Sequence, residues 1–526
     1  MRVVIVGGGT AGWMTASYLA KAFGKMVDIT LVESASIKTI GVGEATFSTF
    51  KLFFDFLGLS ESDWMPHCSA SFKLAIRFQG WTKAGGHFYH PFERYRSASG
   101  ITAADWWLKL KRGEQPFDYA CFTVPRLCDE MRSPRHRDGR LFDKSVRAYF
   151  AEGQERPATM VVENEVQYPY GYHFDAAELA GFLKDYALGR GVRRVTDTVI
   201  DVALSEDGSI SFVRTAGHGA VEGDLFVDCT GFRGLLINKA LGEPFISFRE
   251  TLMNDSAVAI QAPRTNGGEG LRPYTTAHAL SAGWAWNIPL YTRDGTGYVY
   301  SSQHIDADGA ERELRELLGS RSDGRPANHI KMRVGRTRNS WVKNCVAVGL
   351  SSGFVEPLES TGIFFIQHNI EELVSHFPRT TPPDPAMVAS FNRNVGRCID
   401  GVREFLAIHY YAGDRDDTEY WRDTRKIALS DSLREQFDIW SARLPGAKNV
   451  YESYHGFGSH SWSVMLLGLN RPPASNLPVL DAMSPAPGLA LLEGIKADAD
   501  RLVRDLPSAY EYLTEMRRAN QQAPGG

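Results

Sequence analysis

The first 33 residues contain the feature that most restricts the fold. Residues 2–6 form an apolar, β-branched run, and Gly7, Gly9 and Gly12 follow it at the start of a helical stretch. A second apolar run closes with Glu33, about 20 residues after the glycines, where a ribose hydroxyl would be bound. This complete βαβ unit predicts a dinucleotide site. The alternative is that the glycines serve only a tight turn and helix packing, and that Glu33 is a solvated acid at a strand end.

Composition excludes several classes of protein. The 526 residues are 43% hydrophobic and 23% charged, which is ordinary for a globular protein, and the net charge of −4 with no long basic block argues against a nucleic-acid partner. The six cysteines are scattered without metal-ligand spacing, so no metal site is expected and the thiols are expected to be reduced. No apolar run is long enough to span a membrane. We therefore expect a cytoplasmic protein without a membrane partner.

The middle of the chain continues the α/β pattern. Asp175 is expected to cap a helix, strands follow with a turn at Asp207-Gly208, and the apolar run 225–227 leads into Thr230-Gly231. Small residues at that point suit a second contact with the same cofactor, although a plain β-turn would have the same sequence. From about residue 385 onward, helical patterns alternate with loops rich in Pro and Gly, which indicates a mainly helical region.

The stretch FVEPLESTGIFFIQ places Glu356 and Glu359 in apolar surroundings, immediately before Ser360, Thr361 and Gly362. Apolar spacing after Gly362 predicts a helix that ends before Pro378. Free N–H groups at its start form an anion site, and glycine permits close approach. Glu359 could act as a general base, could stabilise a developing cation, or could be only a charge that complements the helix dipole.

Two further segments contain residues that could be either structural or functional. Residues 71–81 alternate as a strand, with Lys73 and Arg77 on the face opposite the apolar residues, so Lys73 is either solvated or catalytic. Trp284 and Trp286 share one face of an extended segment. They could be core residues or a barrier beside a flat cofactor.

Together these motifs resemble one family. GGGTAGW at 7–13, GVGEAT at 41–46, the lysine of FKLAIRF, GWAWNIP at 283–289 and EPLESTGI resemble the flavin-dependent tryptophan halogenases, in order along almost the whole chain. FSTFKLFFDFLGL, FYHPFE and YHGF are most similar to the branch that halogenates C5 or C6 of the indole. The resemblance implies an α/β, FAD-binding Rossmann-like (flavin monooxygenase-like) domain over 1–380 and a mainly helical substrate-binding region over 381–526, with residues about 80–150 contributing to the substrate region.

The resemblance also assigns roles to residues. Lys73 and Glu359 match the catalytic pair, Thr361 and Gly362 match the halide site, and Trp284 with Trp286 would form the barrier on the flavin side. The FAD-binding positions are Gly7, Gly9, Thr10, Ala11, Gly12, Glu33, Gly43, Ala45, Thr230, Gly231 and Gly349. The positions that contact the substrate are His90, Phe92, Ser360, Tyr451 and Tyr454.

The chemistry implied by the resemblance uses O2, chloride or bromide, L-tryptophan, and FADH2 supplied by a separate flavin reductase. Lys73 would hold hypohalous acid by a charge-assisted hydrogen bond or become a chloramine. Glu359 would stabilise the cationic ring and accept its proton. The family also suggests a homodimer.

Three alternatives remain open from the sequence. An FAD-dependent aromatic hydroxylase would share the fold, but usually carries Gly-Asp where this chain has Gly349-Leu350. A halogenase could act on an indole other than tryptophan. A binding module that has lost its redox chemistry is disfavoured by the intact glycines with Lys73 and Glu359.

Overall fold

The computed structural model describes residues 1–36, 43–143, 168–264, 267–446, 448–450 and 456–522. Two residues assigned to the substrate, Tyr451 and Tyr454, lie outside these ranges, as do parts of the GVGEAT motif. All six cysteines are free and buried, as expected of structural thiols. Within the described ranges, none of the helices combines the length and apolar character needed to cross a membrane.

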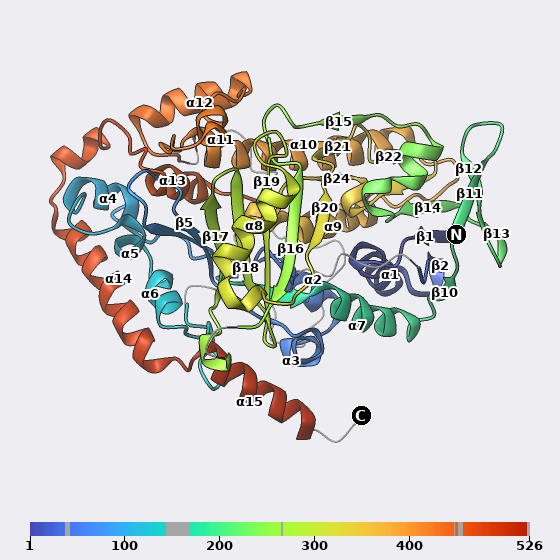
Figure 1. The fold of residues 1–526 in the computed structure, drawn as a ribbon, viewed down its shortest axis with the longest axis horizontal. Helices are drawn as coiled ribbons and strands as arrows, with labels where there is room; N and C mark the ends of the chain where they lie inside the picture. Colours follow the sequence, from blue (N-terminus) through green and yellow to red (C-terminus); the bar gives the residue numbers. More distant parts are fainter. Residues whose placement is uncertain (37–42, 144–167, 265–266, 447, 451–455, 523–526) are drawn as a thin grey trace.

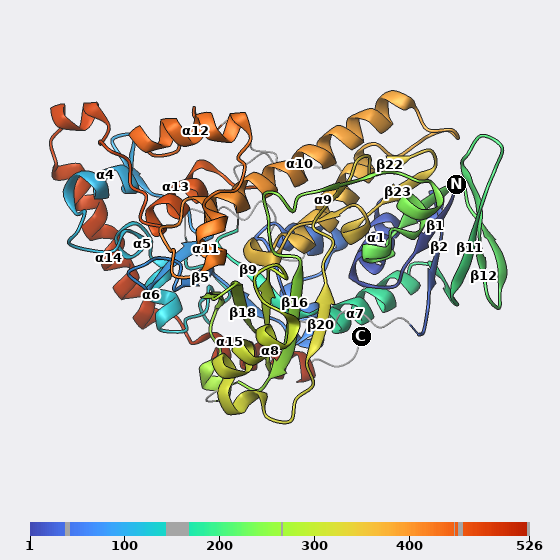
Figure 2. The ribbon, with the colours of Figure 1, turned by 45° about the horizontal axis from the view of Figure 1, so that its top comes forward.

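A six-stranded sheet confirms the predicted Rossmann-like fold. Its order is β10-β2-β1-β14-β23-β22, and every neighbouring pair is parallel except β22 with β23. The bounds are β1 Arg2–Val6, β2 Asp28–Glu33, β10 Arg193–Thr196, β14 Leu225–Asp228, β22 Trp341–Val342 and β23 Cys345–Ala347. Helices α1 (Thr10–Phe23), α7 (Ala176–Leu188) and α9 (Thr361–Ser375) lie beside this sheet (Figures 1 and 2). The central strands are buried along nearly their whole length, which explains their unbroken apolar sequences.

A second, mostly antiparallel sheet occupies the centre of the molecule (Figure 1). Its order is β20-β16-β19-β18-β17-β5-β6, with only β17 and β5 parallel. The bounds are β5 Ala75–Gln79, β6 His87–Pro91, β16 Ser256–Ala262, β17 Tyr274–Leu280, β18 Gly283–Pro289, β19 Asp294–Tyr300 and β20 Asn328–Lys331. Helix α8 (Ala307–Leu318) packs on β16 and β19.

The prediction of a single strand over 71–81 is wrong, and the difference affects the site. The strand is interrupted at Leu74, whose N–H donates to the Pro273 carbonyl at 2.7 Å and whose carbonyl accepts from Phe92 N–H at 3.0 Å. The segment β4 (Ser71–Lys73) therefore pairs with β9 (Gly171–Asp175) in a small sheet with β3 (Gly43–Ala45), while β5 joins the central sheet. Lys73 is buried and Arg77 is partly exposed, so the two side chains do not share one environment.

Helices dominate the chain after residue 385, and the described residues there contain no strand. The bounds are α10 Pro385–Tyr411, α11 Glu419–Thr424, α12 Asp431–Ala442, α13 Ser459–Gly468, α14 Ala486–Asp505 and α15 Ala509–Gln522. Helix α14 packs against the three short helices α4 Ala103–Leu110, α5 Phe117–Cys121 and α6 Val124–Asp129 (Figure 1). These three helices thus lie beside a C-terminal helix, and a shared substrate region stays a prediction.

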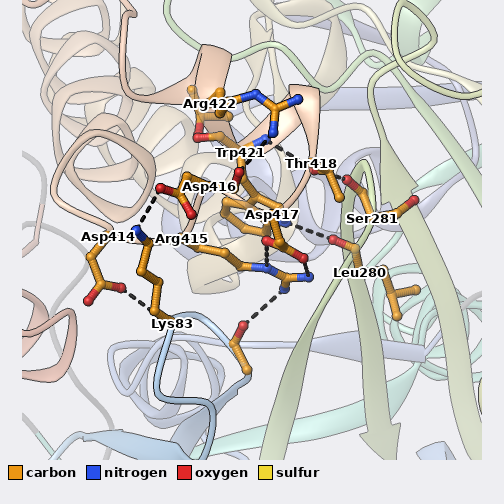
Figure 3. Close-up of polar contacts among 12 residues, drawn as sticks. Lys83, Leu280, Ser281, Asp414, Arg415, Asp416, Asp417, Thr418, Trp421 and Arg422 are labelled. Atoms are coloured by element: carbon orange, nitrogen blue, oxygen red, sulfur yellow. Dashed lines mark hydrogen bonds and ion pairs between the residues drawn. The ribbon is translucent and has the colours of Figure 1, made fainter.

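The corner between α10 and α11 fixes the helical region to the central sheet (Figure 3). Thr418 Oγ1 donates to the Ser281 carbonyl at 2.7 Å, and Trp421 Nε1 donates to the Leu280 carbonyl at 2.8 Å. Arg415 donates to the Gly80 carbonyl at 3.0 Å and lies over the Trp421 ring. These contacts hold the β17–β18 turn, and β18 carries both predicted barrier tryptophans.

Candidate active site

The glycine-rich turn meets two other strand ends at one edge of the parallel sheet. Gly7 N–H donates to the Val32 carbonyl at 2.8 Å, and Cys229 N–H donates to the Val6 carbonyl at 2.9 Å. This edge is where doubly wound sheets bind dinucleotides. Glu33 ends β2 here and is bound by Arg194 Nε at 2.6 Å and Trp13 Nε1 at 3.3 Å, so it is a paired acid at the edge.

The glycines leave space where a dinucleotide would pass. A Cβ built on Gly9 or on Gly231 meets no described atom within 4 Å. A Cβ on Gly12 would instead lie 1.9 Å from the Gly7 carbonyl oxygen, which shows that this glycine is needed for close packing of α1 on the turn. The open positions and the close helix packing together fit FAD.

The start of α9 leaves backbone N–H groups open to a ligand. Ser360 takes a left-handed conformation with φ 62°, and its hydroxyl accepts from Lys73 Nζ at 2.8 Å without capping the helix. Thr361 Oγ1 is buried with no hydrogen-bond partner among the described residues. A Cβ on Gly362 would meet none of the described atoms within 4 Å. The first turn therefore offers N–H groups with open approach, as the sequence predicts.

Lys73 is completely buried beside this turn. Its Nζ also donates to the Thr46 carbonyl at 3.2 Å and lies 4.9 Å from the centre of the Phe92 ring. Burial lowers the pKa of Lys73 to about 7, because Glu359 offsets only part of the cost of desolvation. An amine with this pKa is present in both charge states near neutral pH, which suits either a hydrogen-bond donor or a nucleophile.

Glu359 is held by two histidines. It ends a short 3₁₀ turn, Pro357–Glu359, and its carboxylate oxygens lie 3.0 and 3.1 Å from His90 Nδ1. The same carboxylate lies 2.8 Å from His409 Nε2. Burial alone would raise the pKa of Glu359, but the two histidines outweigh burial and lower it to about 2. Glu359 is therefore ionised at any physiological pH, and the interpretation as a helix-end charge alone does not account for its burial.

A pocket next to Glu359 brings the central sheet and the C-terminal helices together. Its lining consists of Phe47, Ser48, Ile76, His90, Pro91, Phe92, Glu359, Gly456, Phe457, His460 and Ser461. The aromatic lining is of the kind that packs on a flat ring, but the cavity volume is about 20 Å³, so the side chains must move apart before an indole can enter. His90 and Phe92 both line this pocket, and their contact with an indole stays a prediction. The sequence gives no signal for Phe47, Phe457, His460 and Ser461. His409 was also missed, because one histidine in a long amphipathic helix gives no local signal.

The first glutamate of the EPLES motif has a different set of partners. Glu356 is fully buried, and its Oε2 accepts from Trp284 Nε1 at 2.8 Å, Tyr410 Oη at 2.6 Å and Asn254 Nδ2 at 2.7 Å. Trp284 and Trp286 are both buried, with ring centres 6.4 Å apart. Glu356 thus fixes the orientation of the Trp284 indole, and Glu359 faces the pocket.

These features define a class of enzyme. The strand ends where a dinucleotide would bind lie near the start of α9. Ser360, at the start of α9, accepts a hydrogen bond from the buried Lys73. A carboxylate faces the same aromatic pocket. Such an arrangement is typical of a dinucleotide-dependent enzyme that acts on an aromatic substrate.

Comparison with known proteins gives the family. The tryptophan halogenase family model matches residues 2–485. Tryptophan 6-halogenase SttH of Streptomyces toxytricini is 51% identical over 518 residues, which are 98% of each chain. 7-chloro-L-tryptophan 6-halogenase KtzR of Kutzneria sp. (strain 744) is 50% identical over 520 residues, covering 98% of this chain and 99% of that relative.

Comparison with a solved structure leads to the same family. Tar14, a tryptophan C-6 flavin-dependent halogenase (chlorinase) from taromycin biosynthesis, superimposes with a TM-score of 0.92 at 53% identity, covering 98% of this chain and 99% of that chain. The chain belongs to the tryptophan halogenase family. The predicted identity as a flavin-dependent halogenase with FAD as its cofactor is confirmed.

Proposed function

We propose that this enzyme uses FADH2, O2 and chloride or bromide to halogenate the indole ring of L-tryptophan at C6. The observation that carries the proposal is the hydrogen bond between Lys73 Nζ and Ser360 Oγ at 2.8 Å. It connects the first turn of α9 to a lysine that lies 4.9 Å from the ring centre of Phe92, and Phe92 and Glu359 both line the aromatic pocket. A halide site, a holder for the oxidised halogen and a stabiliser of the reacting ring thus follow one another through the protein.

The residues of the chain have separate tasks in this reaction. Bound reduced FAD supplies, with O2, the oxidising equivalents that turn chloride into hypochlorous acid. The open glycines at the sheet edge accommodate the cofactor, and Thr361 and Gly362 hold the halide at the start of α9. Trp284 and Trp286 fill the space on the flavin side and keep the organic substrate from the cofactor.

The second half of the reaction takes place around Lys73. Its ammonium form would hold hypochlorous acid by a hydrogen bond. Its amine form would instead attack the chlorine of hypochlorous acid, which gives a chloramine and releases water. Holding the chlorine donor against one ring carbon fixes the regiochemistry. His90 and Phe92 contact the indole, and the Glu359 carboxylate stabilises the cationic ring and takes the proton that chlorine replaces.

The choice of C6 as the position of halogenation rests on the activities for which the relatives are named. SttH and Tar14 are named as tryptophan 6-halogenases, and both align over nearly the whole of this chain. KtzR is named for a 7-chloro-L-tryptophan substrate, which makes a preformed chlorotryptophan the second candidate substrate. A separate flavin reductase, a homodimer and a cytoplasmic location complete the proposal.

The test is a reaction of the purified protein with FAD, a flavin reductase, NADH, O2, chloride and L-tryptophan, with 7-chlorotryptophan in a parallel reaction. We expect 6-chlorotryptophan by NMR and its loss in Lys73→Ala and Glu359→Gln. Preference for the chlorinated substrate would identify a second-step halogenase. A hydroxylated product that forms without halide would refute the proposal in favour of an aromatic hydroxylase.

A further inference from the structure

His409 is a buried histidine in α10 whose two ring nitrogens both face acceptors. Its Nδ1 lies 2.9 Å from the Phe405 carbonyl oxygen, and its Nε2 lies 2.8 Å from Glu359 Oε1. A carbonyl oxygen can only accept, so Nδ1 must carry a proton. A neutral imidazole then has a lone pair on Nε2, and a lone pair facing a carboxylate at this distance would be repulsive.

One extra proton must therefore lie between His409 and Glu359. His90 helps to place it, since Nδ1 of His90 lies within hydrogen-bond distance of both oxygens of the same carboxylate. An ionised carboxylate accepts both contacts, whereas a protonated carboxyl accepts fewer hydrogen bonds. The His409 ring packs against Phe78, Trp81 and Phe405, so water has no access from that side.

We propose that His409 is a positioning residue that carries a proton on each ring nitrogen and thereby keeps Glu359 ionised beside the substrate ring. This inference rests on the proposed function for its role in the reaction, but the location of the proton can be measured without turnover. The histidinium is fixed from behind by a backbone carbonyl, so its direction is set by the helix and not by the substrate.

Among the described residues, few other charged or titratable groups lie near His409 and Glu359. Lys73 from β4 and His90 from β6 face Glu359, and Glu356 lies near His409. His460 from α13 lies near His90, and burial lowers its pKa to about 3, so His460 is neutral. His409 lies behind Glu359, outside the lining of the pocket, and its second ring nitrogen is fixed by a backbone carbonyl, so it can hold a positive charge beside Glu359 when Lys73 is deprotonated.

The proton can be located by NMR on the full-length FAD-bound protein labelled with ¹⁵N-histidine. The chain has 14 histidines, so the His409 signal is identified by its absence in His409→Gln. We expect ¹⁵N shifts of protonated nitrogens for both ring nitrogens of His409 in the unmodified protein. In Glu359→Gln the negative partner is gone, and we expect Nε2 to give the shift of an unprotonated nitrogen under the same conditions. A ¹⁵N chemical shift typical of an unprotonated Nε2 in the unmodified protein would overturn the proposal.

Kinetics separate this role from a structural one. His409→Gln keeps an N–H donor toward Glu359 but removes the charge, so protonation of the buried carboxyl becomes easier as the pH falls. We expect kcat of this variant relative to the unmodified enzyme to fall about two- to threefold between about pH 8 and about pH 6, with KM unchanged. His376→Gln, at the end of α9, is the control and should show a constant ratio.

An equal loss at every pH in His409→Gln would refute the role in holding charge. If His409→Gln does not fold, the His409 signal is the one that changes in Glu359→Gln and is still present in His90→Gln, since His90 and His409 are the histidines that contact Glu359. That comparison then decides where the proton lies. If the unmodified enzyme chlorinates nothing while Nε2 is protonated, the proposed function fails and the protonated pair stands.

Discussion

Replacing Lys73 by methionine should stabilise the folded protein, although it removes the proposed catalytic amine. The side chain is fully buried, and burial lowers its pKa from 10.5 to about 7. The unfolded chain therefore binds more protons than the folded chain between these two values, and stability rises with pH through this range. The free-energy cost of the buried ammonium is fully present below about pH 7 and amounts to about 5 kcal/mol, at about 1.4 kcal/mol per pKa unit.

Methionine has similar volume and no charge. It loses the hydrogen bonds from Nζ to Ser360 and Thr46, which contribute about 1 kcal/mol each. The net expectation is that Lys73→Met is more stable than the unmodified protein by about 3 kcal/mol near pH 6.5. The difference should shrink by about 1.4 kcal/mol per pH unit and vanish near pH 9.

The assay is urea unfolding of the flavin-free protein at a series of pH values, with Lys51→Met as the matched control. Lys51 is also buried, but Glu61 and Asp55 outweigh burial and raise its pKa. Lys51→Met should therefore destabilise the protein, by about 3 kcal/mol, with little change between pH 7 and pH 9. Equal destabilisation by both substitutions, or a Lys73→Met difference that does not vary with pH, would refute the reasoning.

Three further predictions concern Gly12 in the glycine-rich turn, Gly362 at the start of α9, and Glu356, which binds the Trp284 indole. Gly12→Ala places a Cβ 1.9 Å from the Gly7 carbonyl oxygen, so we expect loss of FAD binding, measured by bound flavin absorbance, together with a lower Tm. Gly362→Ala meets no described atom and should raise stability by about 0.5–1 kcal/mol while blocking the halide; a raised KM for chloride checks it, and an unchanged KM contradicts it. Glu356→Leu leaves three buried donors without their acceptor, so we expect a loss of about 3 kcal/mol in urea unfolding and a changed Trp284 environment by near-UV circular dichroism.

Local patterns in the sequence predict the elements that position the site. The βαβ unit, the helix that starts after Ser360 and the strand that carries both tryptophans follow from spacing of 3.6 or 2 residues, and the structure has each of them. The strand over residues 71–81 fails because alternation does not reveal a change of sheet. Leu74 continues the pattern, and only its backbone partners on Pro273 and Phe92 show the break.

The partners of the site residues depend on tertiary contacts that no local pattern contains. His409 lies 50 residues from Glu359 in the chain, and Trp284 lies 72 residues from Glu356. Neither pair has a characteristic spacing, because each joins a loop or strand to an element formed elsewhere. Motifs thus locate Lys73 and Glu359, while the protonation of these residues follows from the fold.

The environment of Glu359 decides which of its predicted tasks matters. A carboxylate with a pKa of about 2 is a weaker base than a solvated glutamate, so strength as a base is not what burial provides. The cationic ring formed when chlorine adds to an indole is a strong acid and gives up its proton readily even to a weak base. What the step requires is a negative charge that is present before the cation forms and that cannot turn away. His90 and His409 supply this by holding both carboxylate oxygens in a water-poor wall, where a fixed charge acts more strongly than it would in solvent. In the proposed reaction, the two histidines therefore make Glu359 a poorer base and a better electrostatic partner for the ring.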